Sequence, residues 1–180
     1  MYNKLNDFSF IDYVCTFDIV CLTETFVDES FDFKGVFHDY VKIAAPAQKL
    51  SRLGRNSGGV LLLIRKSLSA FISFVDINCE NAVAVKVKKS VFNSDKDVLL
   101  VACYVVPENG PLYDTMAIKD GIVILEENLL HTLQNENMHV LITGDLNART
   151  GCEQYRNEEI VNYVACLRMV VMMMISVMIL

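Results

Sequence analysis

The chain has 180 residues, which is enough for one domain, and 21% of them are charged, as in ordinary globular proteins. Its formal net charge of −6 argues against a protein that binds nucleic acid mainly through a broad basic surface. The six cysteines include no C-x-x-C pair and so show no metal-ligand spacing. From these cysteines we expect a reduced, intracellular protein. The N-terminus has no continuous apolar core after a basic start, so we expect no signal peptide.

The first quarter of the chain predicts a helix and then a strand that ends in a carboxylate. Apolar residues recur at spacings of three and four from Leu5 to Cys15, which is typical of one face of a helix. A strand is expected from Asp18 to Leu22, whose apolar residues alternate onto both faces, as in a strand covered on both sides. Glu24 follows this strand almost at once. The aromatic-rich stretch from Asp28 to Gln48 is predicted to be irregular and to wrap a sheet edge.

The middle of the chain predicts several strands and one long helix. Valine alternates with other residues in one of these strands, which marks it as a half-exposed antiparallel strand joined to the next by a hairpin turn. Asp114 caps a helix whose apolar residues keep spacings of three and four as far as Leu133. The expected strands are Val60–Ile64 after the turn at Gly58-Gly59, Ala70–Val75, the alternating Ala82–Val87, and Val98–Tyr104.

A short apolar run from Val140 to Thr143 predicts a buried strand, and it ends abruptly in Gly-Asp-x-Asn. Gly144 frees the backbone to turn, so Asp145 and Asn147 stand two residues apart at the carboxyl end of a strand. Open α/β sheets place their functional groups there. Because Gly, Asp and Asn are also the commonest turn residues, the spacing alone fits a plain strand end equally well.

Four stretches in a fixed order carry a family resemblance. They are Asp18–Thr25, Gly58–Ile64, Val98–Tyr104 and Leu141–Arg149. Together they resemble the endonuclease/exonuclease/phosphatase superfamily, most closely the endonuclease domain of non-LTR retrotransposon polyproteins. The resemblance runs from about Lys4 to about Gly151. It implies an α/β fold, a four-layer sandwich of the DNase I-like type.

The resemblance implies divalent-metal-dependent hydrolysis of a phosphodiester, with DNA as the substrate and no small organic cofactor. It assigns a Mg²⁺ or Mn²⁺ ion to Glu24, which suits a cation that prefers oxygen ligands and keeps several waters. It makes Asp145 the base that deprotonates the attacking water. It makes Tyr104 and Asn147 hydrogen-bond donors to the phosphoryl oxygens. By themselves, Glu24 would be a solvated strand-end residue and Tyr104 an aromatic packed at the sheet rim.

Two parts of the family pattern are missing from this sequence. The family's first strand, with an Asn linked to the metal, precedes the opening helix, and Met1 begins too late to supply it. A second Asp and a final Asp-His pair belong later in the domain, but no Asp or His follows Asn147. We therefore predict a domain truncated at both ends, with its second sheet largely missing, marginal solubility and impaired activity. The alternative function is a catalytically inactive remnant or a binding module.

The last 20 residues differ in character from the rest. Five of the eight methionines lie between Met169 and Leu180, and this apolar stretch is shorter than the roughly 20 residues that span a bilayer. Extending it backwards takes in Asn162 and Arg168. We predict that residues 1–160 form the truncated domain and that residues 161–180 are a tail unrelated to the family. A membrane tail anchor is the alternative for this tail, and the sequence leaves the oligomeric state open.

Overall fold

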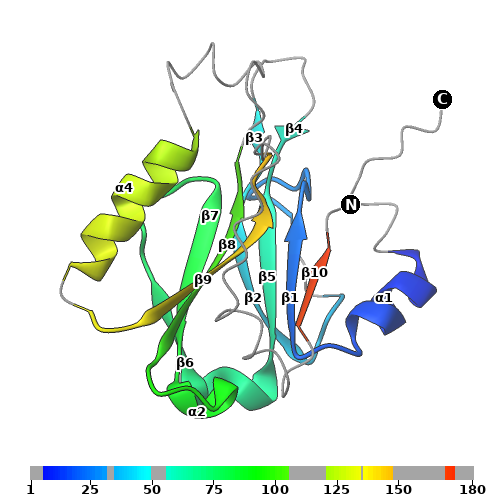
Figure 1. Ribbon diagram of the computed structural model, residues 1–180. Helices are drawn as coiled ribbons and strands as arrows, with labels where there is room; N and C mark the ends of the chain where they lie inside the picture. Colours follow the sequence, from blue (N-terminus) through cyan, green and yellow to red (C-terminus); the bar gives the residue numbers. More distant parts are fainter. Residues whose placement is uncertain are drawn as a thin grey trace, which may run out of the picture.

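The computed structural model describes residues 6–31, 35–49, 56–105, 121–134, 136–147 and 169–172 (Figure 1). The first sheet has the strand order β10-β1-β5-β2, the second has the order β6-β7-β8-β9, and β3 and β4 form a short hairpin. The elements are α1 (Phe8–Val14), β1 (Ile19–Thr23), β2 (Tyr40–Ala45), β3 (Gln48–Lys49), β4 (Asn56–Ser57), β5 (Val60–Arg65), the 3-10 helix η2 (Lys66–Phe71), β6 (Ile72–Val75), β7 (Ala82–Val87), α2 (Lys89–Phe92), β8 (Val98–Tyr104), α4 (Gly121–Leu133), β9 (His139–Asp145) and β10 (Met169–Met172).

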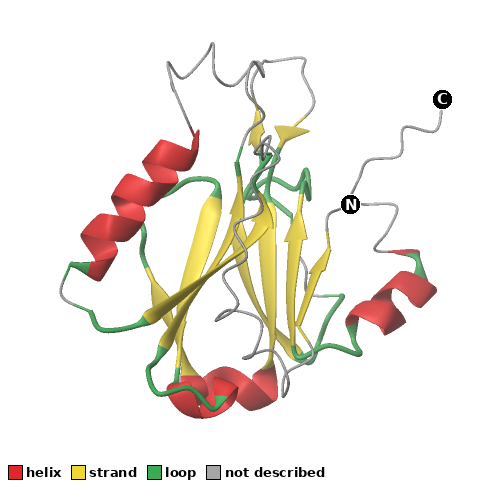
Figure 2. Cartoon of the chain, in the orientation of Figure 1, coloured by secondary structure: helices red, strands yellow, loops and turns green. Residues whose placement is uncertain are grey.

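The two sheets pack face to face between α1 and α4, so the predicted four-layer α/β sandwich is confirmed (Figure 2). The expectation that the second sheet is largely missing is wrong, because each sheet has four strands among the described residues. Periodicity marks a strand but does not say which sheet it joins. The 3-10 helix η2 carries the chain from β5 in the first sheet to β6 in the second.

The core between the sheets is built from alternate residues of facing strands. Cys21 and Leu62 contribute from the first sheet, and Val85, Leu100 and Tyr104 contribute from the second. β1 is buried along its whole length because α1 covers its other face, as the sequence predicts for a doubly covered strand. The prediction that 28–48 is irregular is wrong for β2, which pairs antiparallel with β5.

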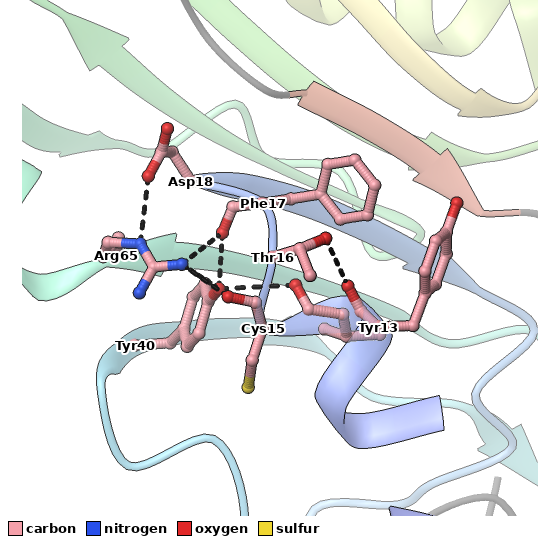
Figure 3. Close-up of polar contacts among 8 residues, drawn as sticks. Tyr13, Cys15, Thr16, Phe17, Asp18, Tyr40 and Arg65 are labelled. Carbon is pink, nitrogen blue, oxygen red and sulfur yellow. Dashed lines mark hydrogen bonds and ion pairs between the residues drawn. The ribbon is translucent and has the colours of Figure 1, made fainter. Parts of the chain in front are cut away.

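The start of β1 is fixed by Arg65 at the end of β5 (Figure 3). Its Nε donates to Asp18 Oδ1 at 3.0 Å, and its Nη2 donates to the carbonyls of Cys15 at 2.7 Å and Phe17 at 3.1 Å. The same Nη2 donates to the hydroxyl of Tyr40, whose ring lies 5.1 Å below the guanidinium carbon. One side chain therefore ties the turn after α1 to β2 and β5.

Helix α4 covers the outer face of the second sheet and connects β8 to the parallel strand β9. Beneath it, Ala84 is fully buried and Lys86 reaches Glu136 at 2.8 Å, so β7 is less exposed than the half-exposed strand predicted. The predicted cap at Asp114 lies outside the described residues.

β9 is an edge strand of this sheet, and Val140 and Ile142 on its outer face are 39% and 42% exposed. The prediction of a buried strand is therefore wrong for that face.

Met169–Met172 of the apolar tail form β10, which pairs in parallel with β1. The other tail residues lie outside the described part of the chain. The structure therefore does not test the alternative of a membrane tail anchor. Among the described residues, no helix has the length and apolar character needed to cross a membrane.

Candidate active site

The candidate site lies where β1, β8 and β9 end, and its first member is Glu24. Glu24 follows β1 with a φ of 51°, so the chain turns in the left-handed region directly after the strand. The turn is held by two backbone hydrogen bonds, from Thr25 N to Gly59 O at 3.2 Å and from Phe26 N to Gly58 O at 3.0 Å. The Gly-Gly entry to β5 therefore fixes the backbone around this carboxylate.

Tyr104 reaches Glu24 from the facing sheet. Its hydroxyl donates to Glu24 Oε1 at 3.4 Å, and its backbone N–H donates to the Asn81 carbonyl at 2.9 Å. Burial, followed by the nearby Glu24 charge, raises the pKa of Tyr104 to about 12. The phenol is therefore protonated at neutral pH and acts as a hydrogen-bond donor.

Asp145 is the last residue of β9 and lies opposite Tyr104 in the sheet register. Its carbonyl accepts from Val105 N at 2.8 Å, which extends the β8–β9 pairing beyond the end of β8. The pKa of Glu24 is raised by burial and next by the charge of Asp145, while the Tyr104 hydrogen bond lowers it. Two carboxylates from opposite sheets thus lie close enough for one charge to disfavour the other.

Asn147 takes part in the turn after β9. Its backbone N–H donates to Asp145 Oδ1 at 3.0 Å, and its side-chain Nδ2 donates to the Val105 carbonyl at 2.8 Å. The residue has a φ of 44°, a conformation that asparagine tolerates better than most residues. One of its two amide hydrogens is therefore used to hold the loop, which leaves the other for a ligand.

Three glycines make this arrangement possible, and the sequence predicted a turn at each of them, at Gly58-Gly59 and at Gly144. A side chain at Gly144, where φ is +130°, would run into the Cys103 carbonyl. A Cβ at Gly58 would lie 3.1 Å from the Tyr104 ring, and one at Gly59 would collide with the Thr25 hydroxyl. The Gly-Gly pair before a core strand is the signal in the sequence, but its contact with Tyr104 depends on two sheets meeting.

Comparison with known families agrees with this geometry. The sequence model of the Endonuclease/Exonuclease/phosphatase family matches residues 5–165. The chain belongs to this family. Its members are generally metal-dependent phosphodiester hydrolases. Among curated proteins, no sequence matches the chain.

Solved structures with the endonuclease/exonuclease/phosphatase fold resemble the chain at low sequence identity. The human Nocturnin catalytic domain, solved with a bound sulfate anion, has a TM-score of 0.55 and 18% identity over 82% of this chain and 57% of that one. A humanized D. rerio TDP2 has a TM-score of 0.48 and 14% identity over 82% of this chain and 56% of that one. The chain therefore spans a little over half the length of these two structures.

The donor groups fit the divalent cation that endonuclease/exonuclease/phosphatase enzymes generally use. Within the described ranges, no group of three or more His, Cys, Asp and Glu side chains is placed to hold a metal ion. Mg²⁺ is often bound through one or two carboxylates while it keeps several waters. Glu24 would supply a hard oxygen ligand of this kind, and a bound cation would offset the repulsion that it feels from Asp145.

Proposed function

We propose that the chain is a divalent-metal-dependent phosphodiesterase that cleaves DNA, with its origin in a retroelement endonuclease. The observation that carries the proposal is the meeting of Glu24, Tyr104 and Asp145 at one end of the sandwich, with the Tyr104 hydroxyl on Glu24. These residues come from strands far apart in the sequence, and the family match covers all three.

In this proposal each side chain has one task. Glu24 holds a Mg²⁺ or Mn²⁺ ion, which when bound supplies a Lewis acid for the phosphate. Asp145 accepts the proton of the attacking water from hydrogen-bond distance. Tyr104 donates its hydroxyl hydrogen to a phosphoryl oxygen as negative charge develops there, and its raised pKa keeps that hydrogen in place. Asn147 donates its second amide hydrogen to the same group.

DNA is favoured as the substrate because the order and the residues of the four sequence stretches look most like those of retroelement endonucleases. The net charge of −6 is compatible with this substrate, because a carboxylate site binds phosphate through its cation.

The test is nicking of supercoiled plasmid by the purified chain in Mg²⁺ or Mn²⁺. EDTA and Asp145→Ala should each abolish the nicking, while Asp12→Ala, which changes an exposed residue of α1, should leave it intact. Cleavage of a small nitrophenyl phosphodiester without any cleavage of DNA would retain the phosphodiesterase and reject the DNA substrate.

A binding module without catalysis is the second candidate function. The observation that favours it is that residues 148–180 contain no Asp or His. Absence of hydrolysis by a folded preparation, combined with retained binding of a labelled DNA duplex, would support this candidate.

A further inference from the structure

Two buried hydroxyls lie just inside the candidate site. Thr23 directly precedes Glu24, and Thr143 precedes Asp145 by two residues. Their exposed fractions are 1% and 7%. Neither Oγ1 atom has a hydrogen-bond partner in the part of the chain that the structure describes. Buried polar groups in native proteins are nearly always paired, with protein or with ordered water, so these two hydroxyls need an explanation.

Both threonine side chains lie on the faces of their strands that are turned toward the other sheet. Thr23 lies on the same face of β1 as Cys21, which belongs to the core between the sheets. Thr143 lies opposite Ala102, another member of that core. β1 and β9 contact each other across this space. Each threonine lies within two residues of one of the two neighbouring carboxylates, so the threonines are on facing strands near the same end of the sandwich. Two residues further along β9, Asp145 lies opposite Tyr104.

One buried water would satisfy both threonine hydroxyls and both carboxylates at once. It needs two to four polar partners, and each threonine hydroxyl can donate to its oxygen. Its own two hydrogens then remain for the two carboxylates. We propose that Thr23 and Thr143 together hold one water that donates to Glu24 and Asp145 and fixes the orientation of both. The threonines are positioning residues. The catalytic consequence rests on the proposed function, whereas the water does not.

Thermal unfolding decides whether the hydroxyls have a partner. If they hold a water, Thr23→Val and Thr143→Val each lower the Tm, and the double variant loses less than the sum, because both side chains serve the same water. If the hydroxyls are unpaired, each valine removes an unfavourable buried group and raises the Tm, which overturns the proposal. Additive losses in the double variant also count against a shared water.

A crystal structure of the chain gives an independent answer. A water within about 2.6 to 3.2 Å of both Oγ1 atoms supports the proposal. Hydroxyls that instead donate to backbone carbonyls, with no water between them, reject it.

Kinetics test the positioning role. If the wild-type chain hydrolyses a DNA duplex, either valine variant should lower kcat by about 10- to 100-fold with KM unchanged, as for other residues that orient a ligand through hydrogen bonds. Thr23→Ser and Thr143→Ser, which keep the hydroxyl, should restore the rate. Thr132→Val, which removes a hydroxyl bonded to the Asn128 carbonyl on α4, is the control and should have no effect. A change in KM alone contradicts positioning. If the wild type hydrolyses nothing, the proposed function fails, and the Tm and the crystal structure still decide the water.

Discussion

The two strands that carry the candidate carboxylates are supported very differently. β1, which leads to Glu24, is buried on both faces and lies inside the first sheet between β10 and β5. β9, which ends at Asp145, is at the edge of the second sheet, and its outer face is partly exposed at Val140 and Ile142. Packing therefore holds the strand that leads to Glu24, whereas backbone geometry and local hydrogen bonds hold Asp145 at the end of β9.

The largest effect is expected at Gly144 in β9, the strand with less packing around it. Gly144→Ala should lower the free energy of unfolding by about 4 kcal/mol or more, because the residue has a left-handed φ and its new methyl group would run into the Cys103 carbonyl. Urea denaturation followed by circular dichroism measures this change. Gly35→Ala is the control, since a Cβ there meets nothing within 4 Å, and its effect should stay below about 1 kcal/mol. Equal stabilities of the two variants would show that the β9 turn tolerates a side chain.

The next test compares apolar residues on the two strands. Leu22→Ala on β1 should cost about 2 to 5 kcal/mol, because the side chain is fully buried against α1. Ile142→Ala on β9 should cost less than about 1 kcal/mol, because its side chain is already 42% exposed. The same urea titrations apply. A loss at Ile142 as large as that at Leu22 would mean that another part of the chain or a second molecule covers β9 in solution.

The starts of the two strands allow a smaller comparison. Arg65→Ala should lower the free energy of unfolding by about 2 kcal/mol, since it removes the donor to the half-buried Asp18 carboxylate and to the Cys15 carbonyl. The corresponding contact at β9, from His139 to Asp95 at 2.7 Å, is exposed, so Asp95→Asn should lower the stability near pH 7 much less than Arg65→Ala does.

The pH dependence of the contact between Asp95 and His139 follows from the direction in which the pKa of Asp95 is shifted. The hydrogen bond with His139 lowers the pKa of Asp95, so its small stabilisation is present above the carboxyl group's unfolded pKa and is lost as the pH falls. Thermal melts of wild type and Asp95→Asn between pH 7 and pH 3 should converge at the acid end. Curves that diverge there would contradict this assignment.

The smallest expected change is a gain in stability at Glu24. Burial and Asp145 raise the pKa of Glu24, so its contribution to stability is greatest below the carboxyl group's unfolded pKa and is lost as the pH rises through the folded value. Glu24→Gln should therefore raise the Tm slightly at pH 7, while the exposed Glu29→Gln should not. Added Mg²⁺ should raise the Tm of wild type more than that of Glu24→Gln. A variant that gains as much from Mg²⁺ as wild type would place the cation elsewhere.

Local sequence patterns predict the strands that carry the candidate site and the points where those strands end. Apolar periodicity predicted β1, β5, β7 and β8, and the Gly-Asp-x-Asn turn predicted where β9 ends. Such signals are local, because the side-chain period of a strand and the φ freedom of glycine depend on a few neighbouring residues.

Which strands share a sheet and which side chains meet depends on how distant segments pack together. β2 was predicted as irregular and β9 as buried, and no local pattern predicted the bond from the Asn147 amide to the Val105 carbonyl. The close approach of Gly58 to Tyr104 and the contact between β1 and β9 likewise join residues from opposite sheets. These features depend on pairing between distant segments, and periodicity in one segment carries no information about the partner that will cover it.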